Sequence, residues 1–184
     1  MNNTDRIILG IDPGTNVMGF GVIEICDREA RMITMGINKL TKVSDPYLKL
    51  QKIFKETLEL IDKYNPDELS IEAPFYGKNV QSMLKLGRAQ GVAISAALSR
   101  EIPIFEYAPR KIKMAITGKG GASKEQVASI LRSMLKIKEI PRDLDATDGL
   151  AAAMCHFYQD KAIKTEKNYR GWEDFMKKNP DRVK

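Results

Sequence analysis

Four acidic residues stand where side chains of this type could gather around a metal ion. Asp12 ends the apolar run RIILGID, and Glu72 lies near the end of DELSIEA. Asp145 and Asp148 are three residues apart in DATDGLAAAMCHF, so on a helix their carboxylates share one face. Carboxylate oxygens with few neutral partners favour Mg²⁺ or Mn²⁺ over zinc. Two such ions held by these residues could hydrolyse a phosphodiester.

Each of these acidic residues, taken singly, also has an ordinary structural role. Asp12 begins an Asp-Pro-Gly sequence that could be a simple turn, and Glu72 could be a surface residue of a strand. Asp145 and Asp148 could be an N-cap and a first-turn residue, which the helix dipole favours. A metal site therefore requires a fold that brings all four together.

The apolar periodicity predicts the elements that would position these residues. Strands are predicted at 6–12, 18–25, 31–40, 67–73 and 102–106, the first three as an antiparallel meander. Helices are predicted at 46–64, 78–100, 109–116, 124–136 and 145–160. This order indicates an α/β protein with a mixed five-stranded sheet flanked by helices. The carboxylates converge if the strands ending at Asp12 and Glu72 are neighbours and the last helix crosses their ends.

The predicted helix 78–100 carries a stripe of small residues. Gly87, Gly91 and Ser95 recur every four residues along it. Glycine inside a helix costs about 1 kcal/mol relative to alanine, so two glycines here suggest that close packing selected them. The stripe would let another helix approach closely.

A local excess of positive charge lies in residues 77–124. The whole chain has a net charge of +6, with eight basic against four acidic residues in 161–184. Within 77–124 only Glu101 and Glu106 oppose the basic side chains. Those basic side chains are Lys78, Lys85, Arg88, Arg100, Arg110, Lys111, Lys113, Lys119 and Lys124. A solvated surface is the ordinary explanation, but the density of charge favours contact with a polyanion such as nucleic acid.

Length and composition predict one domain. A chain of 184 residues can bury one core, here 1–160, followed by a basic and weakly ordered tail at 161–184. No apolar run approaches the roughly 20 residues that span a bilayer, and no secretory signal is recognisable, so we expect a cytoplasmic protein without membrane contact. Cys26 and Cys155 lack metal-site spacing and are expected to be reduced core residues.

Five sequence strings, in order and in spacing, resemble the RuvC family of Holliday junction resolvases. They are ILGIDPGTNVMGFGV, IEAPFYGKN, SMLKLGRAQGVAI, FEYAPRKIK and DATDGLAAAMCH. The resemblance covers roughly residues 6 to 158. It implies a ribonuclease H-like fold, with the family's four catalytic carboxylates falling on Asp12, Glu72, Asp145 and Asp148.

The resemblance also implies the reaction and its partners. It implies an endonuclease of DNA recombination and repair that cuts four-way junctions with two Mg²⁺ ions per active site, Mn²⁺ substituting, and leaves 5′-phosphate and 3′-hydroxyl ends. It implies a homodimer in contact through the helix of Gly87 and Gly91, and a branch-migration complex of RuvA and RuvB as partner. Two-fold symmetry would place two active sites on opposite strands of the junction.

Several residues are candidates for DNA contact. Lys113 and Lys124 match family positions linked to DNA binding and activity, and Phe75 resembles the family's aromatic residue that acts on bases near the cut, although a core phenylalanine is the commoner role. A glycine-rich loop spans 117–124, and Ser123 with Gln126 predicts a capping box that opens the next helix. The predicted DNA contacts are Phe75, Lys78, Arg110, Lys113, Lys119 and Lys124.

Three other functions remain open at this level. The string GIDPGT also resembles the phosphate loop of actin-like ATPases and sugar kinases, but those bind ATP between two domains, for which this chain is short. A second alternative is another ribonuclease H-like nuclease, acting on RNA or on a different DNA branch, and a third is a protein that binds junctions without cutting. The only histidine, His156, would lie about 16 Å along the helix from Asp145, so we expect a structural or solvent-facing role for it.

Overall fold

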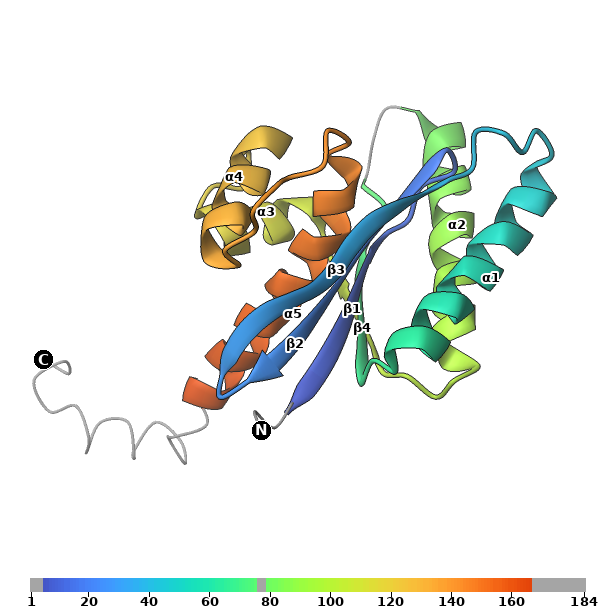
Figure 1. Cartoon of the computed structure of the whole chain (residues 1–184). Helices are drawn as coiled ribbons and strands as arrows, with labels where there is room; N and C mark the ends of the chain where they lie inside the picture. Colours follow the sequence, from blue (N-terminus) through green and yellow to red (C-terminus); the bar gives the residue numbers. More distant parts are fainter. Residues whose placement is uncertain (1–4, 76–78, 167–184) are drawn as a thin grey trace, which may run out of the picture.

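The computed structural model describes residues 5–75 and 79–166, which form a five-stranded sheet with helices on both faces (Figure 1). The strands are β1 (Arg6–Asp12), β2 (Val17–Cys26), β3 (Glu29–Lys39), β4 (Glu68–Glu72) and β5 (Ile104–Tyr107). The helices are α1 (Pro46–Tyr64), α2 (Val80–Leu98), α3 (Pro109–Thr117), α4 (Lys124–Met134) and α5 (Asp145–Glu166). The predicted α/β class and mixed sheet are confirmed.

The sheet has the order β3-β2-β1-β4-β5, with β1 at its centre. The strands β1, β2 and β3 form the predicted antiparallel meander, whereas β4 is parallel to β1 and β5 is parallel to β4. Ile11 pairs with Ile71, so the next residues, Asp12 and Glu72, reach the same edge of the sheet together. The two strands that carry the predicted carboxylates are therefore neighbours.

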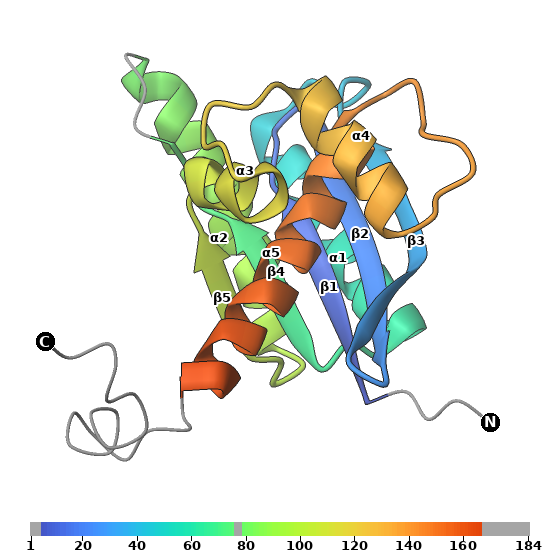
Figure 2. The same ribbon diagram turned by 90° about the vertical axis from the view of Figure 1, so that its left-hand side faces the viewer.

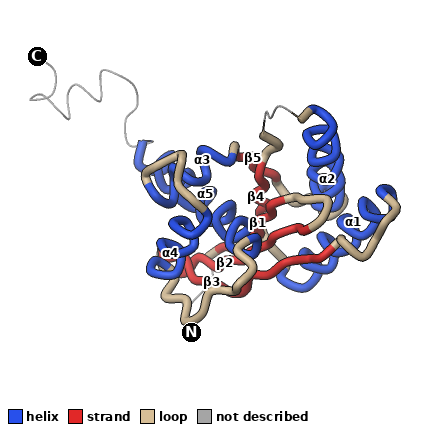
Figure 3. Tube along the Cα trace, turned by 90° about the horizontal axis from the view of Figure 1, so that it is seen from above, coloured by secondary structure: helices blue, strands red, loops and turns tan. Residues whose placement is uncertain are grey.

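Alternation of side chains along the strands divides the core into two layers. Leu9 and Ile11 of β1 pack with the apolar sides of α1 and α2, and Ile8 packs on the other side of the sheet with α5. Viewed from above, α1 and α2 cover one face of the sheet and α3, α4 and α5 cover the other (Figure 3). The central strands β1, β2 and β4 are thus largely buried, whereas the outer strands β3 and β5 are partly exposed.

The first half of α5 lies directly on the backbones of β1 and β2, across the middle of the sheet (Figure 2). A Cβ atom on Gly21 would lie 2.6 Å from the backbone nitrogen of Leu150, and one on Gly19 would overlap the carbonyl oxygen of Asp145. On the helix side, a Cβ atom on Gly149 would lie 2.5 Å from Cα of Phe20. Glycine at these positions lets the helix approach as closely as it does.

Two predicted helix starts are confirmed in detail. Asp45 caps α1, and its carboxylate accepts hydrogen bonds from the backbone nitrogens of Tyr47 and Leu48 at 2.8 and 2.9 Å. Ser123 and Gln126 form the predicted capping box at the start of α4. The cap at Ser123 fixes the direction in which Lys124, the first residue of α4, leaves the loop.

Other sequence predictions have mixed outcomes. Cys26 and Cys155 are both buried, as predicted. The helix α5 continues to Glu166, past the predicted end at 160, and residues 167–184 of the predicted tail lie outside the described residues. No helix in the described part of the chain is long and apolar enough to cross a membrane.

We expect Gly21→Ala to lower the free energy of unfolding by about 1–3 kcal/mol, the range for overpacking a close contact. The added methyl group would meet the backbone of α5 at Leu150, which cannot rotate away as a side chain can. Urea denaturation followed by circular dichroism would measure the change. Gly121→Ala is the matched control, because a Cβ atom at Gly121 meets no atom within 4 Å. Equal stability of the two variants would contradict the close approach of α5.

Candidate active site

Four carboxylates from three elements lie near the carboxyl-terminal edge of β1 and β4. Side chains two apart on a strand share a face, so Asp12 points to the α5 side, as Gly10 does beside Ala153. Ser70 donates a hydrogen bond to the carbonyl of Ala152 in α5 at 2.6 Å, so Glu72, two residues later, also faces α5. The first turn of α5 adds Asp145 and Asp148.

Burial and neighbouring carboxylates raise the pKa of Asp12, Glu72 and Asp148. Burial, followed by the charges of Asp148 and Asp145, raises the pKa of Asp12 to about 6. Burial, followed by the charges of Asp12 and Asp148, raises the pKa of Glu72 to about 8. Burial also raises the pKa of Asp148. Such a group is unfavourable in its fully ionised form unless a cation is present.

Lys124 supplies a cation from within the chain. Its Nζ lies 2.6 Å from Oδ1 of Asp145 and also pairs with Oδ2 of Asp148. Burial alone would lower the pKa of Lys124, but the hydrogen bonds to the two aspartates raise it above its ordinary value. The predicted DNA contact Lys124 therefore lies on the α5 carboxylates in the free protein.

The side-chain chemistry of the site fits a hard divalent cation. All four candidate ligands are carboxylates, and burial together with neighbouring negative charge raises the pKa of Asp12, Glu72 and Asp148. Within residues 5–75 and 79–166, however, no three acidic, histidine or cysteine side chains stand close enough to form a ready metal site. The carboxylates therefore act on one another electrostatically without standing as a ready ligand set, and Lys124 pairs with Asp145 and Asp148.

The other predicted basic contacts lie at different distances from the carboxylates. The charge of Lys113, on α3, lowers the pKa of both Glu72 and Asp148, so Lys113 faces the site. Arg110 lies across the glycine-rich loop, where a Cβ atom on Gly120 would come within 2.5 Å of its Cγ. Lys119 is exposed on the same loop, and Lys78 lies outside the described residues.

A shallow, open hollow lies beside Asp12 and Glu72. Phe75 is 65% exposed, so it is not a core residue. Apolar side chains form most of the remaining wall: Pro13, Ala73, Pro74, Phe75 and Leu86. A flat apolar group such as a nucleobase could bind next to the carboxylates.

Two residues near the site were missed at the sequence level. Leu86 of α2 lines the hollow. Gln90 of α2 is buried and donates from Nε2 to the carbonyl of Glu72 at 3.3 Å and to Oε2 of Glu106 at 2.8 Å. A glutamine among alanines and glycines was the sequence signal that could have identified Gln90, whereas no sequence pattern distinguishes Leu86.

His156 has a structural role, which is one of the two roles expected for it, and it does not face solvent. It is 4% exposed, and its Nδ1 and Nε2 lie 2.7 Å from the Tyr107 hydroxyl and 3.0 Å from Glu68 Oε2. Its ring stacks on Phe105 with the centroids 4.0 Å apart. These contacts join α5 to β4 and β5.

We expect the metal-free protein to become less stable as pH rises from about 4.5 to about 8. Folded Glu72 keeps its proton up to about pH 8, whereas the unfolded chain loses it near the ordinary value of 4.5. Unfolding therefore releases protons in this window, and stability falls as pH rises. Glu72→Gln should flatten the decline by at least about 1 kcal/mol, measured by urea denaturation in EDTA at several pH values.

Two further variants test the cause of this pH dependence. Lys124→Met should steepen the decline, because the Lys124 ammonium lowers the pKa of both Asp12 and Glu72. Glu139→Gln, at an exposed position away from the site, should leave the curve unchanged. Identical curves for wild type and Glu72→Gln would contradict the assignment of the decline to this carboxylate.

Sequence relatives of known family cover almost the whole chain. The sequence profile of "Crossover junction endodeoxyribonuclease RuvC" matches residues 8–156. The chain is 60% identical over 181 residues to the protein of that name from Christiangramia forsetii, covering 98% of this chain and 94% of that one. It is 62% identical over 182 residues to the Bacteroides fragilis protein of the same name, covering 98% and 97%.

Solved structures agree with the sequence relatives. The structure titled "T. thermophilus RuvC in complex with Holliday junction substrate" has a TM-score of 0.78 and 29% identity, covering 85% of this chain and 96% of that one. The yeast mitochondrial Holliday junction resolvase Ydc2, at 16% identity, a TM-score of 0.68 and coverage of 91% and 84%, shares the fold. The chain has a ribonuclease H-like sheet with carboxylates near its edge, and its sequence relatives cover almost its whole length. It belongs to the RuvC family of crossover junction endodeoxyribonucleases.

Proposed function

We propose that this protein is a metal-dependent endonuclease that resolves Holliday junctions by paired cuts in DNA recombination and repair. The observation that carries the proposal is the group of carboxylates at the edge of β1 and β4, where the charge of Asp148 raises the pKa of both Asp12 and Glu72. The solved relative with a Holliday junction substrate supports four-way DNA as the substrate. The products would carry 5′-phosphate and 3′-hydroxyl ends.

Asp12, Glu72, Asp145 and Asp148 would hold the cations, two Mg²⁺ ions per active site in our proposal, with Mn²⁺ as a substitute. When bound, Mg²⁺ lowers the pKa of water and neutralises charge on the phosphate. The carboxylates themselves bind, orient and space the ligand oxygens. Because Asp12 and Glu72 lie on adjacent parallel strands, the sheet rather than a loop would fix their separation.

Lys124 and Lys113 would contact the phosphate of the substrate. Lys124 has to leave Asp145 and Asp148 before those carboxylates can accept another cation, and a DNA phosphate beside the site offers it a new anionic partner. Lys113 already faces the carboxylates from α3. DNA and metal should therefore favour each other's binding. A DNA phosphate would draw Lys124 away from Asp145 and Asp148, and a metal cation would then neutralise the two carboxylates that Lys124 has left.

The remaining predicted contacts would bind the DNA on either side of the cut. Phe75 and the hollow beside it could hold a base near the scissile phosphate. Arg110 and Lys119 lie on α3 and the glycine-rich loop, where they could bind the backbone, and we assign the same role to Lys78. Our proposal places these functions in a nuclease domain of residues 1–160 in the cytoplasm, with RuvA and RuvB as the branch-migration partner.

A homodimer would provide the paired cuts. Three large apolar side chains on one side of α2, Val80, Leu84 and Leu98, are 54–63% exposed. Gly87 and Gly91 lie in the same stripe, and a Cβ atom at either would meet nothing within 4 Å. The helix α1 packs on the opposite side of α2, so the small-residue stripe remains available to a second copy.

Cleavage of a labelled synthetic four-way junction tests the proposed activity. Wild type should nick it symmetrically in Mg²⁺ and not in EDTA, and should leave linear duplex uncut. Asp12→Asn should reduce the rate by more than about 100-fold while junction binding persists, since even groups that only support metal ligands contribute about 10- to 100-fold.

The alternative functions would give different results in that assay. Junction binding without cutting in either Mg²⁺ or Mn²⁺ would support a recruiting protein. Cutting of linear duplex or of RNA would retain the hydrolytic chemistry and reject the junction as substrate. Glu139→Gln is the control for Asp12→Asn, because it removes an exposed carboxylate and should cut at the wild-type rate.

A substitution in the α2 stripe tests the proposed dimer. Gly91→Glu should convert the protein from dimer to monomer in sedimentation velocity, because it introduces a large charged side chain into the α2 stripe. The monomer should remain folded, since glutamate favours the helix more than glycine does. Gln81→Glu, exposed on the same helix but outside the stripe, should remain dimeric. A dimeric Gly91→Glu would contradict this interface.

A further inference from the structure

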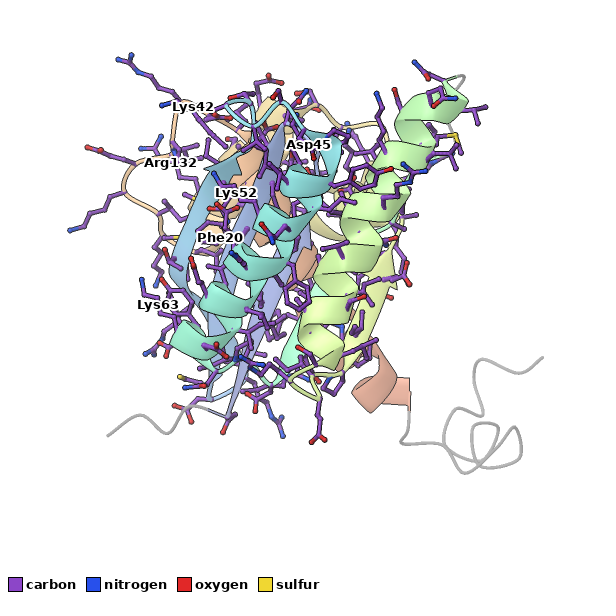
Figure 4. The ribbon with its side chains drawn as sticks, turned by 90° about the vertical axis from the view of Figure 1, so that its right-hand side faces the viewer. Phe20, Lys42, Asp45, Lys52, Lys63 and Arg132 are labelled. Atoms are coloured by element: carbon purple, nitrogen blue, oxygen red, sulfur yellow. The ribbon has the colours of Figure 1, made fainter. Side chains whose placement is uncertain are left out.

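A second group of lysines surrounds the start of α1, outside the basic segment 77–124. Figure 4 shows Lys42 in the loop before α1, Asp45 at the N-cap of α1 and Lys52 in the upper part of the helix. We define the β3–α1 surface by six residues: Lys39, Lys42, Tyr47, Leu48, Lys49 and Lys52. Residues 39–55 contain five lysines and one acidic residue, Asp45, so the local charge is strongly positive.

Hydrogen bonds attach the β3–α1 surface to the loop that follows Asp12. The backbone nitrogen of Leu40 donates to the carbonyl of Asn16 at 2.8 Å. Lys49 Nζ donates to the side-chain oxygen of Asn16 at 3.1 Å. Asn16 lies four residues after Asp12, in the connection between β1 and β2. The surface is therefore continuous with the site of the carboxylates.

The lysines of this surface are available to an external anion. Lys39 lies 3.9 Å from Asp143, and an exposed pair of this kind is weak. Lys52 Nζ donates to the carbonyl of Lys39 at 3.1 Å and lies 3.5 Å from the partly buried Glu56, while the Lys52 side chain itself is 40% exposed. Among the described residues, no acidic side chain forms an ion pair with Lys42. Asp45, the only acidic residue in the stretch, already accepts the two backbone hydrogen bonds of the α1 cap.

Two large apolar side chains stand among these lysines without a place in the core. Tyr47 is 73% exposed and Leu48 is 54% exposed, although both belong to the first turn of α1. Aromatic and aliphatic groups interleaved with lysines match a nucleic acid, whose sugars and bases offer apolar faces between charged phosphates. An acidic protein partner would match the charge, but it would not explain the continuity with the Asp12 loop.

We propose that the β3–α1 surface binds the sugar–phosphate backbone of a junction arm that leaves the active site over the β1–β2 loop. This inference rests on the proposed function. A strand whose scissile phosphate lies at Asp12 would have Phe75 beside it in the hollow and the Asn16–Lys49 pair at the adjacent β1–β2 loop. The basic segment 77–124 and the β3–α1 surface would then bind DNA on opposite sides of the cut.

The test is the salt dependence of junction binding by the full-length protein. Each lost phosphate contact should reduce the slope of log Kobs against log salt by about 0.9. Lys42→Gln combined with Lys52→Gln should therefore reduce it by about 1–2, with weaker binding at moderate salt. The cleavage rate at saturating DNA should remain at the wild-type value, because neither lysine contacts the carboxylates.

The matched control replaces two basic residues at the other end of the sheet. Lys63 lies in the last turn of α1, far from Lys42 in Figure 4, and Arg28 lies in the turn between β2 and β3. Lys63→Gln combined with Arg28→Gln should keep the wild-type slope. An unchanged slope in the Lys42→Gln and Lys52→Gln double variant would overturn the proposal. The surface would then bind a protein, or no partner at all.

Site-directed cross-linking gives an independent measurement of position. Cys26 and Cys155 are buried, so Lys42→Cys provides an accessible thiol for a photoactivated cross-linker. We expect it to cross-link to a junction arm, and Lys63→Cys to give no product. Absence of a product at Lys42→Cys, with wild-type cleavage retained, would reject the surface alone. Loss of junction binding and cutting in the wild type would reject the proposed function as well.

Discussion

The active-site geometry depends on the direct contact between the backbone of α5 and the backbones of β1 and β2. Glycine at 19, 21 and 149 removes the side chains that would normally separate a helix from a sheet. The first turn of α5 is thereby held at the edge where β1 and β4 end, and the aspartates of that turn approach Asp12 and Glu72. A single methyl group in this contact would move two carboxylates relative to the other two.

That approach has an electrostatic consequence that other parts of the fold offset. Four carboxylates at one edge of a sheet repel one another, and burial strengthens the repulsion. The raised pKa values of Asp12 and Glu72 and the pairing of Lys124 with the α5 aspartates both reduce the net negative charge. The capping box at Ser123 directs Lys124 into that position. In the free protein, protonation and Lys124 thus neutralise only part of the negative charge of the four carboxylates.

Sequence reasoning predicted what depends on local pattern. The apolar run before Asp12 gave a central strand, helical periodicity gave α1 and α5, and the family resemblance supplied the roles of the carboxylates. What it could not predict depends on contacts between distant segments. The fit of Gly19 and Gly21 under α5, the pairing of Lys124 with Asp145, and the bond from Gln90 to Glu72 arise only after the sheet and helices assemble. Exposure of Phe75 likewise follows from its place beyond the end of β4, since an isolated phenylalanine is more often buried.

The helix α2 has two roles, on two different sides. One side holds Gln90 against the carbonyl of Glu72, and the other presents the exposed stripe that would contact a second copy. If two copies meet along that stripe, a rigid helix pair rather than flexible loops sets the span between the two catalytic centres. Only a substrate with two scissile bonds at that span could engage both centres at once. Discrimination among DNA shapes would then be a matter of length matching, independent of the bases at the cut.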